Sequence, residues 1–400
     1  PLIISTLGED ENSRINVFGE TLNLVIRIRD FAESDQILAG QKIYDQLKEK
    51  YSFLPLEPIP VKGQKNPLPV FEFNGRKKKE VTSGITSSRM IVSEMVGRQA
   101  ESELLQNKIH ELLQGKGAVV NVIGKAGIGK SRLIAETRQK ELMKQIALFE
   151  GRAVSNGQNL SFHPIIQIIK SWAGITEEDL PSAAVEKLQS NIRRIYNEAF
   201  DEVFPFVATM MGYRLEGKAK ERLEGIEGEA LENLILKNVR DLLARATQIR
   251  PVFIIVEDAH WCDISSVKLM ESLFKLSRNR RILFVNVFRP GYKETGERIS
   301  KFLEENLKEN FLEIFIESLN KEESELLIRN LLHKASLPEE INNQIIERSV
   351  GNPFFIEEVL RSFIDDGLIG MKDDAFTLTD NIKLANIPES VDKVILSRIE

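Results

Sequence analysis

The chain has 400 residues, of which 42% are apolar and 28% charged, the proportions of a soluble globular protein. This length predicts about two or three domains, because one hydrophobic core stops growing at about 250–300 residues. The net charge of −6 comes from interspersed acidic and basic residues, and no apolar stretch reaches the ~18–20 residues of a membrane span. We therefore expect neither nucleic acid nor a membrane as a direct partner.

The cysteine content and the two ends of the sequence set further bounds. One cysteine, Cys262, excludes an internal disulfide framework and suits the reducing cytoplasm, where we expect the protein to be. No signal-peptide pattern opens the chain. The first residue is Pro1 rather than Met, and a helical pattern still runs at Glu400, so we expect a piece of a longer protein.

Residues 1–73 predict an α+β segment. The apolar pattern indicates strands at 15–18, 37–39, 54–61 and 69–73, and helices at 21–31 and 41–50. Residues 62–67 form a loop by composition. The segment has too few apolar residues to fold well alone.

Three motifs in this segment occur in an informative order: FGETLNLVIR at 18–27, QIL at 36–38 and PVKG at 60–63. Their order resembles the C-terminal half of the catalytic domain of class III adenylyl/guanylyl cyclases, which implies a partial ferredoxin-like fold. The resemblance implies that Asn23 orients the ribose, Arg27 stabilises charge on the reacting phosphate, and Lys62 contacts the triphosphate. Asn23 and Arg27 are four residues apart and share a helix face.

The cyclase resemblance also has departures and a missing part. Glu20 stands where Asp is commonest, and Asn16, at the base-selecting position, leaves adenine or guanine open. Cyclisation would expel pyrophosphate, and the charge that develops on the reacting phosphate needs a fixed guanidinium. The family's metal-binding aspartates lie in the N-terminal half of the domain, absent here, so a complete site needs the longer protein and a second cyclase chain in a homodimer.

Each of these residues also has a simpler interpretation. Asn23 can be a helix cap, Arg27 a solvated surface charge and Lys62 a turn lysine. Residues 74–94 then change to a basic run followed by Thr, Ser and Gly, which predicts a linker. A second domain opens at Met95-Val96-Gly97-Arg98 and continues into a helix at 101–113.

Residues 118–133, AVVNVIGKAGIGKSRL, contain the pattern Gly, four residues, Gly-Lys-Ser between a strand and a helix. Glycines let backbone N–H groups converge on one phosphate, and the helix N-terminus adds its dipole. Lys130 would reach the β- and γ-phosphates, and Ser131 would hold Mg²⁺. The sequence therefore predicts a cradle for ATP and Mg²⁺, formed by Gly124, Gly127, Gly129, Lys130 and Ser131.

Residues 251–263, PVFIIVEDAHWCD, give a second strong signal. The apolar run 252–256 ends in two carboxylates, which is typical of a buried parallel strand that ends at a site. Glu257 falls at the Mg²⁺ position of phosphate-loop ATPases and Asp258 at the position that polarises the attacking water. The alternative is an acidic cap after a core strand. Trp261 and Cys262 are interpreted as packing residues.

The rest of the second domain alternates strands and helices. Strands are expected at 146–150, 282–288 and 311–316, a helical stretch at 175–248 broken near Pro205 and at 212–228, and helices at 322–332 and 339–349. His163, beside a proline at a helix start, is interpreted as packed or capping. Arg289 follows the strand at 282–288, where it is either a γ-phosphate sensor or a surface arginine.

Gly351-Asn352-Pro353 then breaks the chain before a helix that runs toward residue 363, with Pro353 in its first turn. A hairpin is expected at 368–378 and a further helix at 388–399.

The Val-Gly-Arg opening, the Glu-Asp-Ala-His-Trp-Cys-Asp run and the Gly-Asn-Pro element together resemble AAA-like ATPases of the STAND group (signal-transduction ATPases with many domains). Such modules are fused to bacterial cyclases and transcription regulators. The resemblance implies that Val96 and Gly97 lie near the base, that Arg289 senses the γ-phosphate, and that Pro353 lies against adenine. It implies an α/β P-loop core at 95–335, then a helical lid and the start of a winged-helix region at 336–400.

Two functions follow from these expectations. The first is a signalling enzyme, a nucleotide cyclase that makes cyclic AMP from ATP, regulated by an ATP-binding and ATP-hydrolysing STAND-type module. An upstream signalling ligand or protein would act through repeats beyond residue 400. The alternative is a nucleotide-gated scaffold or transcription regulator with a vestigial cyclase segment.

Overall fold

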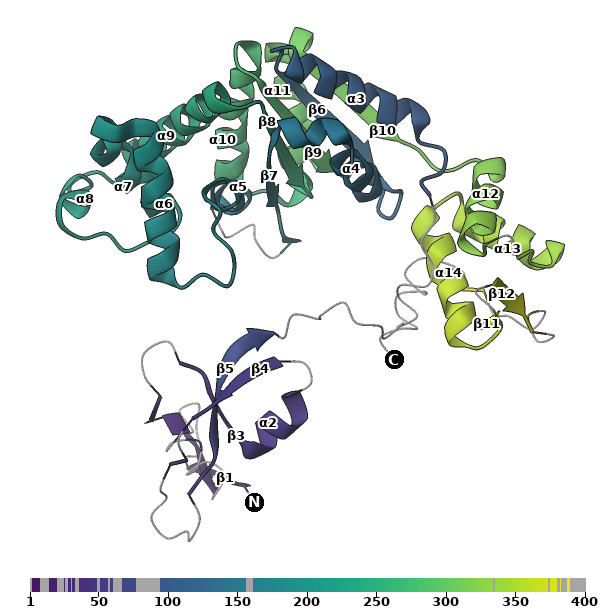
Figure 1. Ribbon diagram of the computed structural model, residues 1–400, viewed down its shortest axis with the longest axis horizontal. Coiled ribbons are helices and arrows are strands. Elements are labelled where there is room, and N and C mark those ends of the chain that lie inside the picture. The colour runs from purple at the N-terminus through teal and green to yellow at the C-terminus, as the bar shows by residue number, and fades with distance from the viewer. Residues whose placement is uncertain are drawn as a thin grey trace. The chain divides into compact units, whose positions relative to one another are not determined.

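The computed structural model describes residues 2–7, 14–19, 25, 28–29, 31–32, 36–48, 51–56, 58–59, 67–76, 94–155, 161–333, 335–372, 375–379, 382 and 387–388 (Figure 1). The chain divides into two compact units, Pro1–Gly84 and Ile85–Glu400. This boundary falls inside the predicted linker at 74–94.

The first unit is built from short antiparallel strands. β1 (Leu2–Leu7) pairs with β2 (Arg14–Gly19), and a second sheet has the order β3-β5-β4, with β3 at Leu38–Gly40, β5 at Val70–Arg76 and β4 at Tyr51–Pro55. Helix α2 (Gln41–Leu47) packs on this sheet by stacking Tyr44 on Phe71, with ring centroids 3.9 Å apart. The α+β character of the segment is therefore confirmed.

Several sequence predictions for this unit differ in detail or remain untested. The strand predicted at 54–61 is shorter because β4 ends at Pro55, although Ile59 still pairs with Leu68 beyond it. β1 was not predicted. Asn23, Arg27 and Lys62, the cyclase-like residues, lie outside the described residues.

The second unit contains a five-stranded parallel sheet in the order β10-β6-β9-β8-β7. Its strands are β6 (Ala118–Gly124), β7 (Ala147–Arg152), β8 (Val252–Glu257), β9 (Ile282–Phe288) and β10 (Phe311–Ile316). β6 and β9 are buried along their whole length, as expected for Val- and Ile-rich strands covered on both faces. All five predicted strands are confirmed, and their carboxyl ends share one edge of the sheet.

Helices cover both faces of this sheet (Figure 1). One face packs in a single cluster with α3 (Gln99–Leu113) and α4 (Lys130–Arg138). The other packs with α5 (His163–Ala173), α10 (Ile264–Phe274) and α11 (Arg298–Asn306), and its cluster extends into a helical layer. That layer comprises α6 (Pro181–Tyr196), α7 (Phe200–Met210), α8 (Gly217–Glu221) and α9 (Gly228–Ile249).

The predicted break near Pro205 is wrong, because α7 runs through that proline. Proline removes one backbone donor from a helix, but Val203, Phe204, Phe206 and Val207 are all buried around it. This packing outweighs the lost hydrogen bond. Among the described helices, none is both long and apolar enough to cross a membrane.

A row of polar side chains crosses three neighbouring strands inside the sheet. Asn121 on β6 is aligned with Asn286 on β9 and with Glu313 on β10. Asn286 Nδ2 donates to Asn121 Oδ1 at 2.9 Å, and Asn121 Nδ2 donates to Glu313 Oε1 at 3.3 Å. Both asparagines have no solvent exposure. Asn121 is the polar residue that interrupts the apolar run of the strand predicted before the phosphate loop.

A separate hydrophobic cluster forms the lid. It contains α12 (Lys321–Leu331), α13 (Glu339–Ser349), α14 (Pro353–Asp365) and the hairpin of β11 (Ile369–Lys372) and β12 (Ala375–Leu378). The cluster also includes Val96 and Leu319, so it contains residues on both sides of the boundary expected between 335 and 336. The helix expected at 388–399 lies almost entirely outside the described residues.

The chain before α14 has a left-handed turn that packs against the backbone of Leu319. Val350 and Gly351 both have left-handed backbones, with φ of 48° and 69°. A Cβ on Gly351 would lie 2.1 Å from Leu319 O, and Leu319 N donates to Gly351 O at 2.8 Å. Only glycine fits this contact. The contact joins the segment before α12 to the segment before α14.

Candidate functional site

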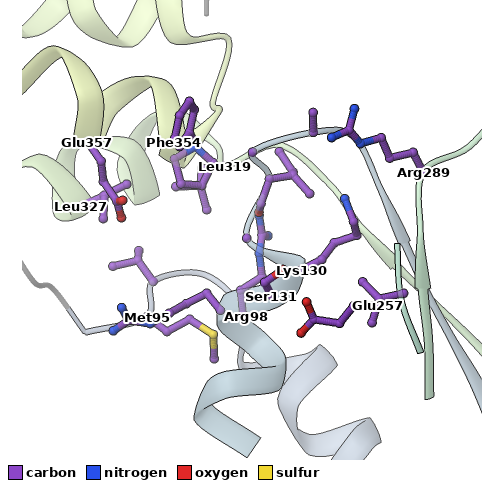
Figure 2. Close-up of a pocket in the computed structure, with 18 of the residues that line it drawn as sticks. Met95, Arg98, Lys130, Ser131, Glu257, Arg289, Leu319, Leu327, Phe354 and Glu357 are labelled. Atoms are coloured by element: carbon purple, nitrogen blue, oxygen red, sulfur yellow. The ribbon is translucent and has the colours of Figure 1, made fainter. Parts of the chain in front are cut away.

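A cavity of about 380 Å³ lies between the carboxyl edge of the parallel sheet and the lid (Figure 2). The phosphate loop and the ends of β8 and β9 line one side of it, and α14 lines the other. This is the expected place for a ligand in an open parallel α/β sheet.

The phosphate loop lies between β6 and α4. Gly127 and Gly129 have φ of 72° and 103°, a region that glycine enters without strain. Both line the cavity, together with Lys130 and Ser131. Gly124 is behind the loop, where a Cβ would lie 2.9 Å from Ile316 O. Gly124 therefore permits close packing of the strand end and does not line the cavity.

Lys130 is a buried cation at the centre of the site, with 9% exposure. Its Nζ donates to Gly124 O and Lys125 O, both at 2.7 Å. The pKa of Lys130 is lowered to about 8, mainly by burial and also by the positive charge of Arg289, while Asp258 opposes the change. Arg289 projects from the end of β9 toward the phosphate loop (Figure 2), so two cations face the same end of the cavity.

This shift predicts a pH dependence for the binding of a polyphosphate. Only protonated Lys130 attracts phosphate, and above its pKa of about 8 the free protein must first take up a proton. Affinity should therefore be constant near pH 7 and fall about tenfold per pH unit above pH 8. Equilibrium titrations between pH 7 and 9.5 measure this, and Lys130→Arg should remove the decline because arginine stays charged. An unchanged affinity of the wild-type protein at pH 9.5 would contradict the prediction.

The two carboxylates at the carboxyl end of β8, Glu257 and Asp258, face the same cavity, and both are paired with arginine. Arg138 Nη2 lies 3.2 Å from Glu257 Oε1, and Arg152 Nε donates to Asp258 Oδ2 at 3.0 Å. Arg152 Nη2 also lies 3.7 Å from Glu257 Oε2. Asp258 itself has a left-handed backbone with φ of 53°. The arginines neutralise both carboxylates in this state.

Arg138 and Arg152 were missed by sequence reasoning. Arg138 is in the last turn of α4 and Arg152 is the last residue of β7. β7 and β8 are neighbouring parallel strands, with Arg152 aligned to Glu257. The available signal was an arginine at the end of a predicted strand, but such a residue is commonly a solvated surface charge.

The Glu-Asp-Ala-His-Trp-Cys-Asp run is explained mostly by structure. Asp263 caps α10, since its Oδ1 accepts from Ser266 N at 2.9 Å. His260 is 1% exposed against Trp261 and Tyr292, and burial lowers its pKa to about 4, so the ring is neutral at pH 7. Burial raises the pKa of the Cys262 thiol, which excludes a reactive thiolate and confirms a packing role.

The other end of the cavity is largely apolar, with Met95, Val96, Leu319, Leu327 and Phe354 in its wall. Pro353 also lines it, at the first position of α14. Glu357, one turn later, adds a carboxylate whose pKa is raised by burial. This wall suits a flat apolar group such as a nucleotide base.

Arg98 holds the segment that enters this wall, residues 94–98, in place. It is 5% exposed and donates to Gly97 O at 3.0 Å and to Glu317 O at 2.6 Å. Gly97 has φ of 67°, and a Cβ there would lie 2.4 Å from Glu323 Oε1. Gly97 thus positions Val96 without lining the cavity itself.

The structure brings most of the predicted site residues together. Those that line the same cavity are Val96, Gly127, Gly129, Lys130, Ser131, Glu257, Asp258, Arg289 and Pro353. Within the described part of the chain, no cluster of three His, Cys, Asp or Glu side chains is arranged to hold a metal alone. Mg²⁺ in nucleotide sites needs few protein ligands, because phosphates and water supply the others. Ser131 with Glu257 fits that mode.

Comparisons with known proteins agree with this part of the structure. The family model described as "AAA ATPase domain" matches residues 94–285. A second model, a domain of unknown function (DUF8739), matches residues 320–376, which is the lid. The chain therefore contains an AAA-type ATPase module with a P-loop α/β fold.

A curated relative is the uncharacterized protein R02095 of Rhizobium meliloti (strain 1021), 25% identical over 350 residues, which are 87% of this chain and 32% of the relative. The chain thus spans about a third of the length of that relative.

Similar solved structures include ORC2 of Aeropyrum pernix in ADPNP-ADP complexes, with a TM-score of 0.40, 13% identity, and coverage of 73% of this chain and 68% of that one. The Walker-type ATPase PABY2304 of Pyrococcus abyssi has a TM-score of 0.34 at 11% identity, with coverage of 68% and 69%.

Proposed function

We propose that residues 94–379 bind ATP with Mg²⁺ and hydrolyse it slowly, as the regulatory module of a longer signalling protein. The observation that carries this proposal is the shared cavity of Lys130, Ser131, Glu257, Asp258 and Arg289. These residues provide a phosphate cation, a metal hydroxyl, two carboxylates and a second cation, the set that phosphoryl transfer to water needs.

In this mechanism Lys130 exchanges its hydrogen bonds to the two loop carbonyls for contacts with the phosphates. Its attraction to the phosphates is stronger than in water because the site is partly buried. Ser131 and Glu257 would hold Mg²⁺, whose charge would neutralise the phosphate oxygens. Asp258 would accept a hydrogen bond from the attacking water. Because Arg152 donates to Asp258 Oδ2, that oxygen is occupied until the pair separates. The pairing supports slow hydrolysis.

A nucleotide titration tests the proposal directly. The melting temperature should rise with ATP concentration, because a ligand that binds the folded state stabilises it. The rise should be larger with Mg²⁺ than with EDTA, and phosphate should be released slowly. No nucleotide-dependent change in melting temperature with Mg²⁺ would overturn the proposal.

We further propose that the first unit is the C-terminal part of a nucleotide cyclase domain that is active as a homodimer and makes cyclic AMP from ATP. The support is the order of the motifs that contain Asn23, Arg27 and Lys62, together with a helix-covered antiparallel sheet. Arg27→Ala in the full-length protein should reduce cyclic nucleotide synthesis strongly, whereas Arg29→Ala, two residues later in the sequence, should not.

An assay for both cyclic AMP and cyclic GMP decides between this proposal and its alternative. ATP binding without either product would support a nucleotide-gated scaffold or transcription regulator with a vestigial cyclase segment. An upstream signalling ligand or partner protein, acting beyond residue 400, is part of both proposals. The ATP of the phosphate loop is in each case a regulatory input.

A further inference from the structure

The backbone carbonyls of the phosphate loop are all bound by donors, from Gly124 to Gly129. Donors from the ATPase core bind four of them: Lys130 Nζ (Gly124 O and Lys125 O, 2.7 Å each), Arg98 Nη2 (Ile128 O, 3.4 Å) and Leu133 N (Gly129 O, 3.0 Å). The start of lid helix α14 supplies the other two. Asn352 Nδ2 donates to Ala126 O at 3.1 Å, and Phe354 N donates to Gly127 O at 3.3 Å.

These hydrogen bonds to carbonyls also set the direction of the N–H group in each of the same peptides. In a trans peptide the C=O and the following N–H point in opposite directions. When Asn352 binds the carbonyl of Ala126, the N–H of Gly127 is turned away from the lid contact. Phe354 does the same for the N–H of Ile128. A loop that cradles an anion must present its N–H groups, and two of its peptide planes are oriented by the lid.

Asparagine at position 352 can both cap α14 and donate to the carbonyl of Ala126. Asn352 Oδ1 accepts from Phe354 N at 3.1 Å and from Phe355 N at 3.4 Å, so it caps α14. Asp, Ser and Thr cap helices about as well as Asn, but only the amide adds an N–H donor beside the accepting oxygen.

The glycine at position 127 permits this contact. A Cβ on Gly127 would lie 2.8 Å from Asn352 Oδ1 and 2.9 Å from Phe354 Cβ. Gly127 therefore gives the loop its left-handed turn and lets the lid approach the loop backbone.

We propose that Asn352 is a positioning residue of the phosphate cradle: its amide orients the Ala126–Gly127 peptide, so that full phosphate affinity requires the lid to be seated on the loop. This inference rests on the proposed ATP site. Because coupling between sites is reciprocal, phosphate binding should in turn hold the lid on the loop.

The test separates capping from loop positioning. Asn352→Thr and Asn352→Asp each keep a cap and lose the amide donor, and Thr adds no charge. Asn320 caps α12 by accepting from Glu323 N at 2.8 Å, and its side chain does not line the cavity, so Asn320→Thr and Asn320→Asp are matched controls. Titrations use ATP and inorganic pyrophosphate, and the latter has no base to contact the lid.

Both Asn352 variants should bind ATP and pyrophosphate about tenfold more weakly, the usual effect of one positioned hydrogen bond. The Asn320 variants should bind both within about twofold of wild type. In the nucleotide-free protein, amide exchange of the peptide at 124–131 should be faster in Asn352→Thr than in Asn320→Thr, while exchange in β8 and β9 stays equal, which shows an intact fold.

Wild-type affinity of Asn352→Thr for pyrophosphate would overturn the positioning role, and so would unchanged exchange at 124–131. The failure of the ATP site itself has a different signature: Lys130→Ala would then bind ATP as the wild-type protein does. The two outcomes are therefore distinguishable in the same titration series.

Discussion

Lys130→Ala should reduce ATP affinity by at least about 30-fold, because removing one partner of a buried, hydrogen-bonded charge pair costs about 2–5 kcal/mol. Lys130 is 9% exposed and lies in the cavity wall beside Ser131. In the wild-type protein ATP should raise the melting temperature, whereas the variant should show almost no rise at the same ATP concentration.

The adjacent loop provides a control for this variant. Lys125 is exposed and its side chain does not line the cavity, so Lys125→Ala should bind ATP within about threefold of wild type. Equal ATP affinity of Lys130→Ala and Lys125→Ala would contradict the assignment of the phosphate loop as the nucleotide site.

Asp258→Asn should leave ATP binding nearly intact and lower the hydrolysis rate about 100-fold or more, the usual contribution of a positioned general base. Asparagine keeps the size of the side chain and can still accept a hydrogen bond from Arg152, as Asp258 does at 3.0 Å. It cannot take a proton from water. Single-turnover hydrolysis with saturating ATP measures the chemical step without the binding step.

The matched control is the same substitution five residues later. Asp263 caps α10, and asparagine caps a helix as well as aspartate does, so Asp263→Asn should hydrolyse ATP at the wild-type rate. If Asp258→Asn also kept the wild-type rate, another group would have to activate the water, and the role given to Asp258 would be wrong.

The parts of the site that were predicted from sequence are contiguous in the chain. The phosphate loop needs glycines, Lys130 and Ser131 at fixed spacing, and the strand before Glu257 is a continuous apolar run. Such signals combine local backbone requirements with burial on both faces of a parallel sheet, and both can be recognised in one short stretch.

The parts that were missed depend on residues distant in sequence. Arg138 and Glu257 are 119 residues apart, and Asn352 and Ala126 are 226 apart. Ion pairs and carbonyl contacts of this kind arise only when the strand order and the lid position are known. The packing of α12 with α14 was not predicted for the same reason, because α12 has the pattern of an ordinary amphipathic helix until its packing partners are known. For Asn23, Arg27 and Lys62 the cyclase assignment stays a prediction.

The polar row across β10, β6 and β9 has a consequence for strand alignment. Val- and Ile-rich strands that are buried on both faces can pair almost equally well in several registers. An unsatisfied buried amide costs about 1–3 kcal/mol, so pairing Asn121 with both Asn286 and Glu313 favours one alignment.

Asn121 and Asn286 each stand three residues before a site residue, Gly124 and Arg289. A slip of one residue would displace Arg289 by about 3.3 Å along the strand and turn it to the opposite face of the sheet. The Asn121–Asn286 pair therefore fixes the register of β6 against β9, and with it the relative positions of the phosphate loop and Arg289 at the edge of the sheet.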